Sequence, residues 1–141
     1  METTSHLFLS CNFAAQLWTW LGSLLQIVFQ PNNFRELFEN FVTGWSPLLA
    51  QIATAAVLHV LHVIWLARNS IRFNNATLSI HAAKIKVLTS VQLSANLMAD
   101  PSNSDEQPIL QQLAVTPCSA AARSASVKMV LWCSPCIGWM K

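Results

Sequence analysis

The chain has 141 residues, of which 53% are hydrophobic and 10% are charged, and its eight basic and six acidic side chains leave a net charge of +2. This length supports one compact domain, and the small number of charges excludes a disordered acidic or basic chain. Three glycines and no tyrosine argue against turn-rich β-sandwiches and barrels, and the chain has neither a dinucleotide fingerprint nor a phosphate-binding P-loop. The composition is typical of a buried helical assembly or of a chain with membrane affinity.

Two helices are predicted in the first third of the chain. Apolar residues recur at helical spacing between residues 13 and 29, and this amphipathic helix should end before Pro31. Asn33 and Glu36 then have the spacing of a capping box, in front of a short apolar face that Gly44 closes. The second helix is therefore expected to be short.

Two longer helices should follow. Ser46 as N-cap with Pro47 at the first helical position opens the longest helix, which can run to about Asn74. A fourth helical pattern extends from about residue 78 to residue 99. The predicted fold class is all-α, a small irregular bundle of about four helices.

The composition changes after residue 99, which divides the chain into three parts. Residues 1–99 form the helical region, and residues 100–126 are rich in Ser, Pro, Gln and Ala and are interpreted as a linker. Residues 127–141 are apolar again, but Pro135 and Gly138 interrupt any periodicity. We expect the linker and this tail to be largely disordered.

The amino terminus lacks the basic region and apolar stretch of a secretory signal, and four scattered cysteines do not form a disulfide framework. An intracellular, reducing compartment is therefore expected. The segment 48–66 is close to the length of a membrane-spanning helix, but it contains His59 and His62, which make insertion costly. A membrane contact through 48–66 stays open as an alternative.

His6 and Cys11 are the candidate metal ligands. Imidazole and thiolate both bind zinc, but a structural site needs four ligands, so the pair is an incomplete zinc half-site at most. The plainer interpretation is a surface histidine and a buried cysteine. Cys133 and Cys136 have the C-x2-C spacing of a zinc knuckle or redox pair, and could complete the set only across the linker.

Catalytic and nucleic-acid signals are weak. The six acidic residues are scattered, so no converging carboxylates for a two-metal site are expected. His59 and His62 lie three apart on the third helix, and core or groove histidines explain them better than metal ligands. The six tryptophans are explained by a helical core, and eight dispersed cations do not predict a nucleic-acid interface by charge.

Three segments nevertheless resemble one family. The sequence E-T-T-S-H-L-F-L-S-C-N-F-A-A-Q-L-W at residues 2–18 resembles the end of the zinc-binding domain that follows the reverse transcriptase in plant non-LTR (LINE-type) retroelements. The sequence V-I-W-L-A-R-N-S-I-R-F at 63–73 is similar to the W-x-x-R-N-x-x-x-F signature of the same proteins. The sequence W-C-S-P-C-I-G-W-M-K at 132–141 resembles their lead-in to the RNase H domain.

The resemblance implies a truncated and catalytically inert piece of a protein whose parent family is an RNA-directed DNA polymerase and ribonuclease H. It also implies a location in the nucleus or the cytoplasm. It makes His6 and Cys11 the last two zinc ligands, with the two cysteine ligands upstream of Met1, and it places the first catalytic aspartate after Lys141. No catalytic or cofactor-binding residue is assigned. Zinc would bind weakly, and nucleic acid, the parent family's partner, is not expected to be retained. A membrane-associated helical protein, or a helical interaction module that self-associates through apolar helices, stays open.

Overall fold

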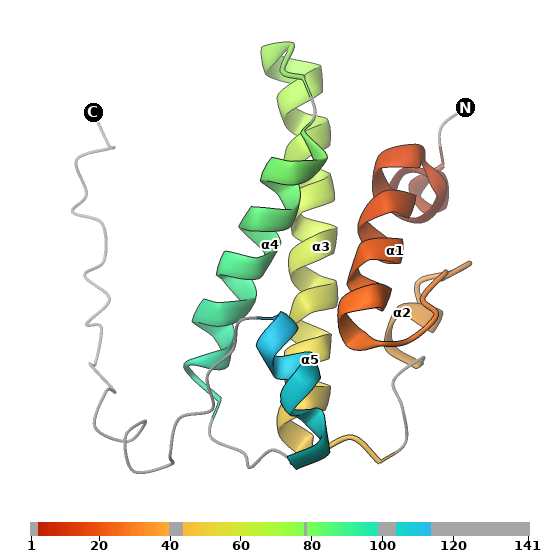
Figure 1. The fold of residues 1–141 in the computed structure, drawn as a ribbon. Coiled ribbons are helices and arrows are strands. Elements are labelled where there is room, and N and C mark those ends of the chain that lie inside the picture. The colour runs from red at the N-terminus through yellow and green to blue at the C-terminus, as the bar shows by residue number, and fades with distance from the viewer. Residues whose placement is uncertain (1–2, 40–43, 78, 99–103, 114–141) are drawn as a thin grey trace, which may run out of the picture.

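The computed structural model describes residues 3–39, 44–77, 79–98 and 104–113, and every regular element in these ranges is helical, which confirms the all-α fold class. The long helices are α1 (Asn12–Leu25), α3 (Pro47–Asn74) and α4 (Ile80–Ala95), and the short ones are α2 (Glu36–Glu39), α5 (Gln107–Gln112), the π-helical turn η1 (His6–Ser10) and the 3-10 turn η2 (Ser104–Glu106). α3 and α4 form an antiparallel pair, and α1 leans against them (Figure 1). The tail 127–141 lies outside the described residues.

Helix α3 begins and ends as its sequence predicts. Ser46 has an extended backbone, and its Oγ accepts a hydrogen bond of 3.2 Å from the Leu49 backbone N–H, while Pro47 occupies the first turn. The helix ends at Asn75, which is left-handed at φ 50°. The N-cap with a following proline satisfies an N–H that would otherwise have no partner and fixes φ for the first turn. Ser46, Pro47 and Leu49 lie within four positions of one another, so the sequence alone predicts the start of the helix.

Helix α1 is shorter than the predicted 13–29. Gln26 turns left-handed at φ 58°, and the Ile27 N–H donates to the Gly22 carbonyl at 2.9 Å, which closes the helix. The chain then doubles back, so that the rings of Phe29 and Trp18 lie 5.6 Å apart. A Cβ atom on Gly22 would lie 2.8 Å from the Phe29 Cβ, so only glycine allows this close return. The apolar pattern continues past Leu25 because the segment that follows the helix also packs on the core.

The predicted capping box of the second helix is present. The Asn33 Oδ1 accepts a hydrogen bond from the Glu36 backbone N–H at 3.0 Å, and the Glu36 carboxylate accepts from the Asn32 backbone N–H at 2.7 Å. Helix α2 then extends only to Glu39, whose side chain pairs with Arg35 across one turn at 3.5 Å. These two acidic residues are thus a structural cap and a surface ion pair.

The core lies between α1, α3 and α4. Helix α3 buries a continuous inner face from Leu48 to Ile64, and α4 packs on it through Ala83, Val87, Val91 and Ala95. These four residues recur every four positions, so they form one face of α4. Ser79 caps α4, with its Oγ accepting from the Ala82 N–H at 3.2 Å.

The segment 104–113 belongs to the bundle, although the sequence analysis assigned it to a linker. Ile109, Leu110 and Leu113 are buried, and α5 contacts α1 (Figure 1). The buried Glu106 carboxylate accepts hydrogen bonds from the Ser46 backbone N–H at 2.6 Å and from the Ser46 hydroxyl. A few apolar residues and one carboxylate thus attach this segment to the N-terminus of α3, where the helix dipole favours a negative charge.

Helix α3 also has the length and hydropathy of a membrane span. It is the one such helix in the described part of the chain, with a mean hydropathy of 1.8 over an 18-residue window of which 50% is buried inside the bundle. A core helix of a soluble protein has the same properties, because its buried face is equally apolar. Length and hydropathy therefore do not distinguish the two cases.

Candidate functional site

Residues 3–18 fold into one unit that comprises η1 and the first part of α1. The indole Nε1–H of the buried Trp18 donates to the backbone carbonyl of Phe8 at 2.8 Å, which ties η1 to the first helix. The ring of Phe8 packs edge-on against Phe34 at 6.2 Å. The aromatic residues of this segment therefore hold the amino-terminal turn in place.

The predicted zinc ligands lie at either end of the turn η1: His6 is its first residue, and Cys11 directly follows it. His6 is exposed, and its Nδ1 is 3.3 Å from the Ser10 hydroxyl. Cys11 is half-buried and acts as the N-cap of α1: its sulfur accepts from the Ala14 N–H at 3.4 Å, and its thiol donates to the Leu7 carbonyl at 3.2 Å. The Cys11 side chain thus has a structural role in addition to any metal-binding one.

His6 and Cys11 are two candidate ligands, fewer than a tetrahedral zinc site requires. No group of three or more His, Cys, Asp or Glu side chains that could hold a metal ion occurs among the described residues. Structural zinc needs four ligands, and two ligands do not offset the loss of its hydration shell. Cys133 and Cys136 lie outside the described residues, so their part in a site is not addressed by this geometry.

A groove brings two of the family-like segments together. It has a volume of about 470 Å³ and is lined by residues of η1 and of the carboxyl-terminal half of α3, namely Leu7, Phe8, Trp65, Arg68, Asn69, Ile71 and Arg72. The first two residues belong to segment 2–18 and the other five to segment 63–73. Sequence spacing alone gives no signal for this convergence, since it depends on how η1 packs against α3.

One wall of the groove offers an exposed aromatic ring next to cations. Trp65 is 51% exposed, and its ring stacks on the His62 ring with centroids 6.1 Å apart and planes 26° apart. Arg68 and Arg72 follow one and two turns later on α3. The sequence from residue 40 to residue 99 contains no acidic residue, so both helices that carry Arg68, Arg72, Lys84 and Lys86 lack carboxylates. The electrostatic potential of this region favours anions.

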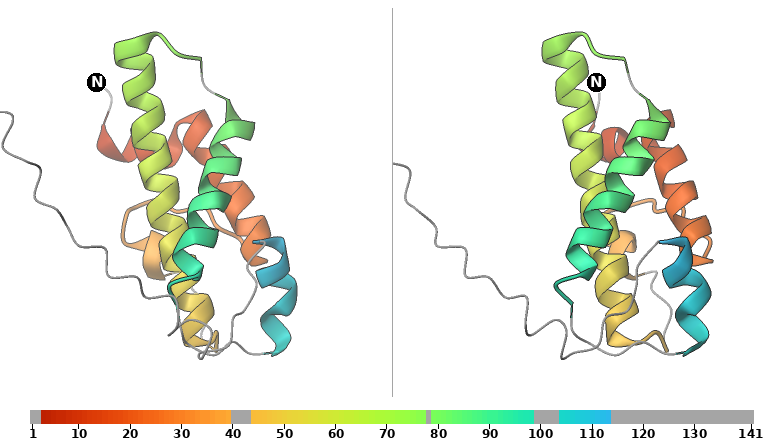
Figure 2. Two further views of the ribbon diagram at one scale, coloured as in Figure 1. Left: turned by 90° about the vertical axis from the view of Figure 1, so that its left-hand side faces the viewer. Right: turned by 60° about the vertical axis from the view of Figure 1, so that its left-hand side comes forward.

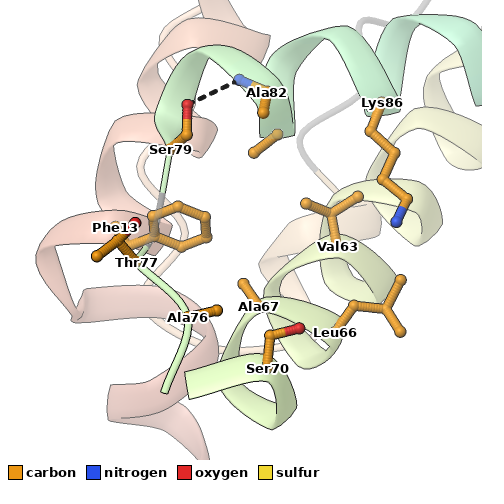
Figure 3. Close-up of a pocket in the computed structure, with 11 residues that line it drawn as sticks. Phe13, Val63, Leu66, Ala67, Ser70, Ala76, Thr77, Ser79, Ala82 and Lys86 are labelled. Atoms are coloured by element: carbon orange, nitrogen blue, oxygen red, sulfur yellow. Dashed lines mark hydrogen bonds between the residues drawn. The ribbon is translucent and has the colours of Figure 1, made fainter. Parts of the chain in front are cut away.

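A second hollow of about 240 Å³ lies between α1, α3 and the start of α4 (Figure 3). Phe13, Val63, Ala67 and Ala76 give it apolar walls, and Lys86 lies at its edge. No carboxylate, imidazole or thiol is among the residues that line it. Lys86 is the one ionisable side chain among the residues that line it.

His59 forms a contact between two helices. Its Nε2 shares a hydrogen bond of 2.8 Å with the Ser94 hydroxyl, which links α3 to α4. Burial lowers the pKa of His59 below 6.5, and the positive charge of His62 lowers it further. The neutral imidazole is therefore the form that the folded protein favours.

The lowered pKa of His59 predicts a loss of stability in acid. In the unfolded chain this imidazole takes up a proton at its ordinary pKa of 6.5, but in the folded protein only at lower pH. The stability that it contributes is thus fully present above pH 6.5 and is lost as the pH falls through the lower, folded value. Urea denaturation measures the free energy of unfolding at about pH 7.5 and at about pH 5.5. The decrease in this free energy between the two pH values should be smaller in His59→Gln than in the wild type.

The exposed His81 on α4 gives a matched control, because His81→Gln removes an imidazole that has no hydrogen bond to another helix among those described. This variant should keep the wild-type dependence on pH. Equal pH dependence in His59→Gln and the wild type would show that another group is responsible.

Comparison with protein-family models, with curated proteins and with solved structures finds no match to this chain.

Proposed function

We propose that this chain is a non-catalytic helical module, similar to the end of the zinc-binding domain in plant LINE-type retroelement proteins, that binds single-stranded nucleic acid weakly through the groove between η1 and α3. The observation that carries the proposal is that Leu7 and Phe8 of the first family-like segment line the same groove as Trp65, Arg68 and Arg72 of the second. The chain from residue 40 to 99 also lacks the carboxylates that would repel a phosphate.

The side chains in the groove suit an unpaired strand better than a duplex. An exposed indole can stack on a base, and stacking is worth about 1–3 kcal/mol per base regardless of sequence. Two arginines can contact about two phosphates, which supports only weak, non-specific affinity with a Kd of about 10⁻⁴–10⁻⁶ M. Such a weak affinity agrees with the small number of cations in the chain. With so few cations, charge alone does not predict the interface.

Fluorescence anisotropy with a labelled oligonucleotide tests the proposal. A single strand that contacts two arginines should give a slope of log K against log salt concentration of about −1.4, because each neutralised phosphate contributes about −0.7. Arg72→Gln should reduce the magnitude of this slope by about half. Trp65→Leu should weaken binding about tenfold or more without changing the slope.

Lys84→Gln is the matched control, because it also removes one positive charge. Lys84 lies 5.8 Å from the ring of Trp20, outside the groove between η1 and α3. Its removal should leave the salt dependence unchanged. If Lys84→Gln and Arg72→Gln weaken binding equally, the groove is not the site and only net charge matters. Absence of any binding to single strands at low salt would overturn the proposal.

Zinc binding is expected to be weaker than micromolar for the isolated chain. Two ligands, His6 and Cys11, give an incomplete coordination sphere. Competition with a chromophoric chelator measures the affinity, and His6→Ala identifies the contribution of the pair. A 1:1 affinity of about 1 µM or tighter that is lost in His6→Ala would show that a complete site forms.

A further inference from the structure

The outer side of α3 carries a regularly spaced stripe of side chains that faces away from the core. Helix α3 runs along one side of the molecule (Figure 2). The residues of this outer stripe are Gln51, Ala55, Leu58, His62, Trp65 and Asn69, separated by alternating steps of four and three. Such spacing keeps residues in line along one face of a helix and is the pattern of a helix-pairing seam. Leu58 is 52% exposed and Trp65 is 51% exposed.

The stripe contains both a projecting group and a hollow. Trp65 projects near its carboxyl-terminal end and is held by its stacking on His62. Near the amino-terminal end, a groove of about 420 Å³ surrounds the small side chain of Ala55, with Leu58 and Met98 among its mostly apolar walls. A large aromatic ring and an apolar hollow beside a small residue are complementary in size.

An antiparallel second copy places each group opposite the other. The steps of four and three divide the stripe into two series of residues spaced seven apart, namely 51, 58 and 65, and 55, 62 and 69. In antiparallel helix pairs with this spacing, a residue of one series lies opposite a residue of the other series in the second helix. A two-fold axis at the level of residue 60 sets Trp65 beside Ala55 of the second copy, Leu58 beside His62, and Gln51 beside Asn69. Each of the four inner layers then contains an apolar side chain, and the layers of Gln51 and Asn69 lie at the ends.

Charge also favours a second copy over an acidic or basic partner at this stripe. The six residues include no carboxylate, lysine or arginine, so two copies meet without repulsion between permanent charges. In the antiparallel arrangement, the positive end of each α3 dipole also lies beside the negative end of the other. Arg68 and Arg72 lie close to the carboxyl-terminal end of the stripe. The arginines of one copy are therefore at the opposite end of the helix pair from those of the other copy.

We propose that the outer stripe of α3 is a homodimer interface in which Trp65 of each copy inserts into the hollow beside Ala55 of the other. The stripe is about 27 Å long and about 10 Å wide, or about 300 Å² per copy, against about 800 Å² per partner in a standard stable interface. The dimer is therefore weak and depends on protein concentration. It covers Trp65, so the dimer and a nucleic-acid strand compete for that residue.

Analytical ultracentrifugation of the full chain over a range up to about 1 mM tests the interface. The wild type should change from monomer to dimer within this range. Ala55→Glu places a carboxylate in the hollow, and insertion of Trp65 from the second copy would remove water from that charge. The variant should therefore weaken the dimer about a hundredfold or more. Ala15→Glu makes the same change at an exposed position of α1 and should leave dimerisation unchanged.

Three results would overturn the proposal: a monomer throughout the range, dimerisation of Ala55→Glu equal to that of the wild type, or equal weakening by Ala15→Glu. Circular dichroism of each variant shows that it is folded. Leu58→Ala provides an independent check, since it removes apolar surface without adding charge and should weaken the dimer by about tenfold. Ala55 does not line the nucleic-acid groove, so failure of the dimer and failure of the proposed function are distinguishable.

Discussion

Replacing Trp18 with alanine should lower the free energy of unfolding by about 3–5 kcal/mol. Trp18 is 1% exposed, packs on Phe29 at 5.6 Å, and donates its indole N–H to the Phe8 carbonyl at 2.8 Å. The variant therefore leaves a large cavity and also removes the hydrogen bond that holds η1 against α1. Urea denaturation followed by far-ultraviolet circular dichroism measures the loss, and a protein of marginal stability would unfold largely at room temperature.

The two contributions of Trp18 can be separated. Trp18→Phe keeps most of the buried ring but leaves the Phe8 carbonyl without the indole donor, so it should cost about 1–3 kcal/mol. Trp20→Phe is the matched control two residues away, because Trp20 is half-buried and its substitution should cost less than about 1 kcal/mol. If Trp18→Phe and Trp20→Phe were equally mild, the Phe8 hydrogen bond would not stabilise the fold.

Local chemistry explains which parts of the fold are predictable from sequence. The start of α3 is signalled by the adjacent Ser46 and Pro47, and the capping box by Asn33 and Glu36 three positions apart, so both predictions are confirmed. The end of α1 depends on Phe29 returning to pack over Gly22, which is a tertiary contact. Hydrophobic periodicity cannot show where such a return begins, because both the helix and the returning chain carry apolar residues.

The same reason limits prediction of the site. His6 and Cys11 are visible in the sequence as a pair of ligand types, but the capping role of Cys11 becomes evident only with the Ala14 N–H in place. The groove joins Phe8 to Trp65, which are far apart in the chain, through the packing of η1 on α3. Each family-like segment is recognisable alone, whereas their shared groove is a property of the fold.

The attachment of α5 to the bundle depends on Glu106, and Glu106→Ala should lower the free energy of unfolding by about 2–3 kcal/mol. Glu106 is 5% exposed, and its carboxylate accepts from both the Ser46 backbone N–H and the Ser46 hydroxyl. Its removal leaves a buried N–H without that partner at the first turn of α3. It also removes a negative charge from the positive end of the helix dipole.

A graded series distinguishes the charge of Glu106 from its hydrogen bonds. Glu106→Gln keeps the shape and one acceptor but loses the charge, so it should cost about 1 kcal/mol, less than Glu106→Ala. The exposed neighbour Asp105 is the control, and Asp105→Ala should change stability by no more than about 0.5 kcal/mol. Because α5 buries Ile109, Leu110 and Leu113 only while it is attached, hydrogen exchange of the 109–113 amides should accelerate in Glu106→Ala more than exchange of the α4 amides. Uniform acceleration in both segments would instead mean that Glu106 acts on global stability and not on the docking of α5.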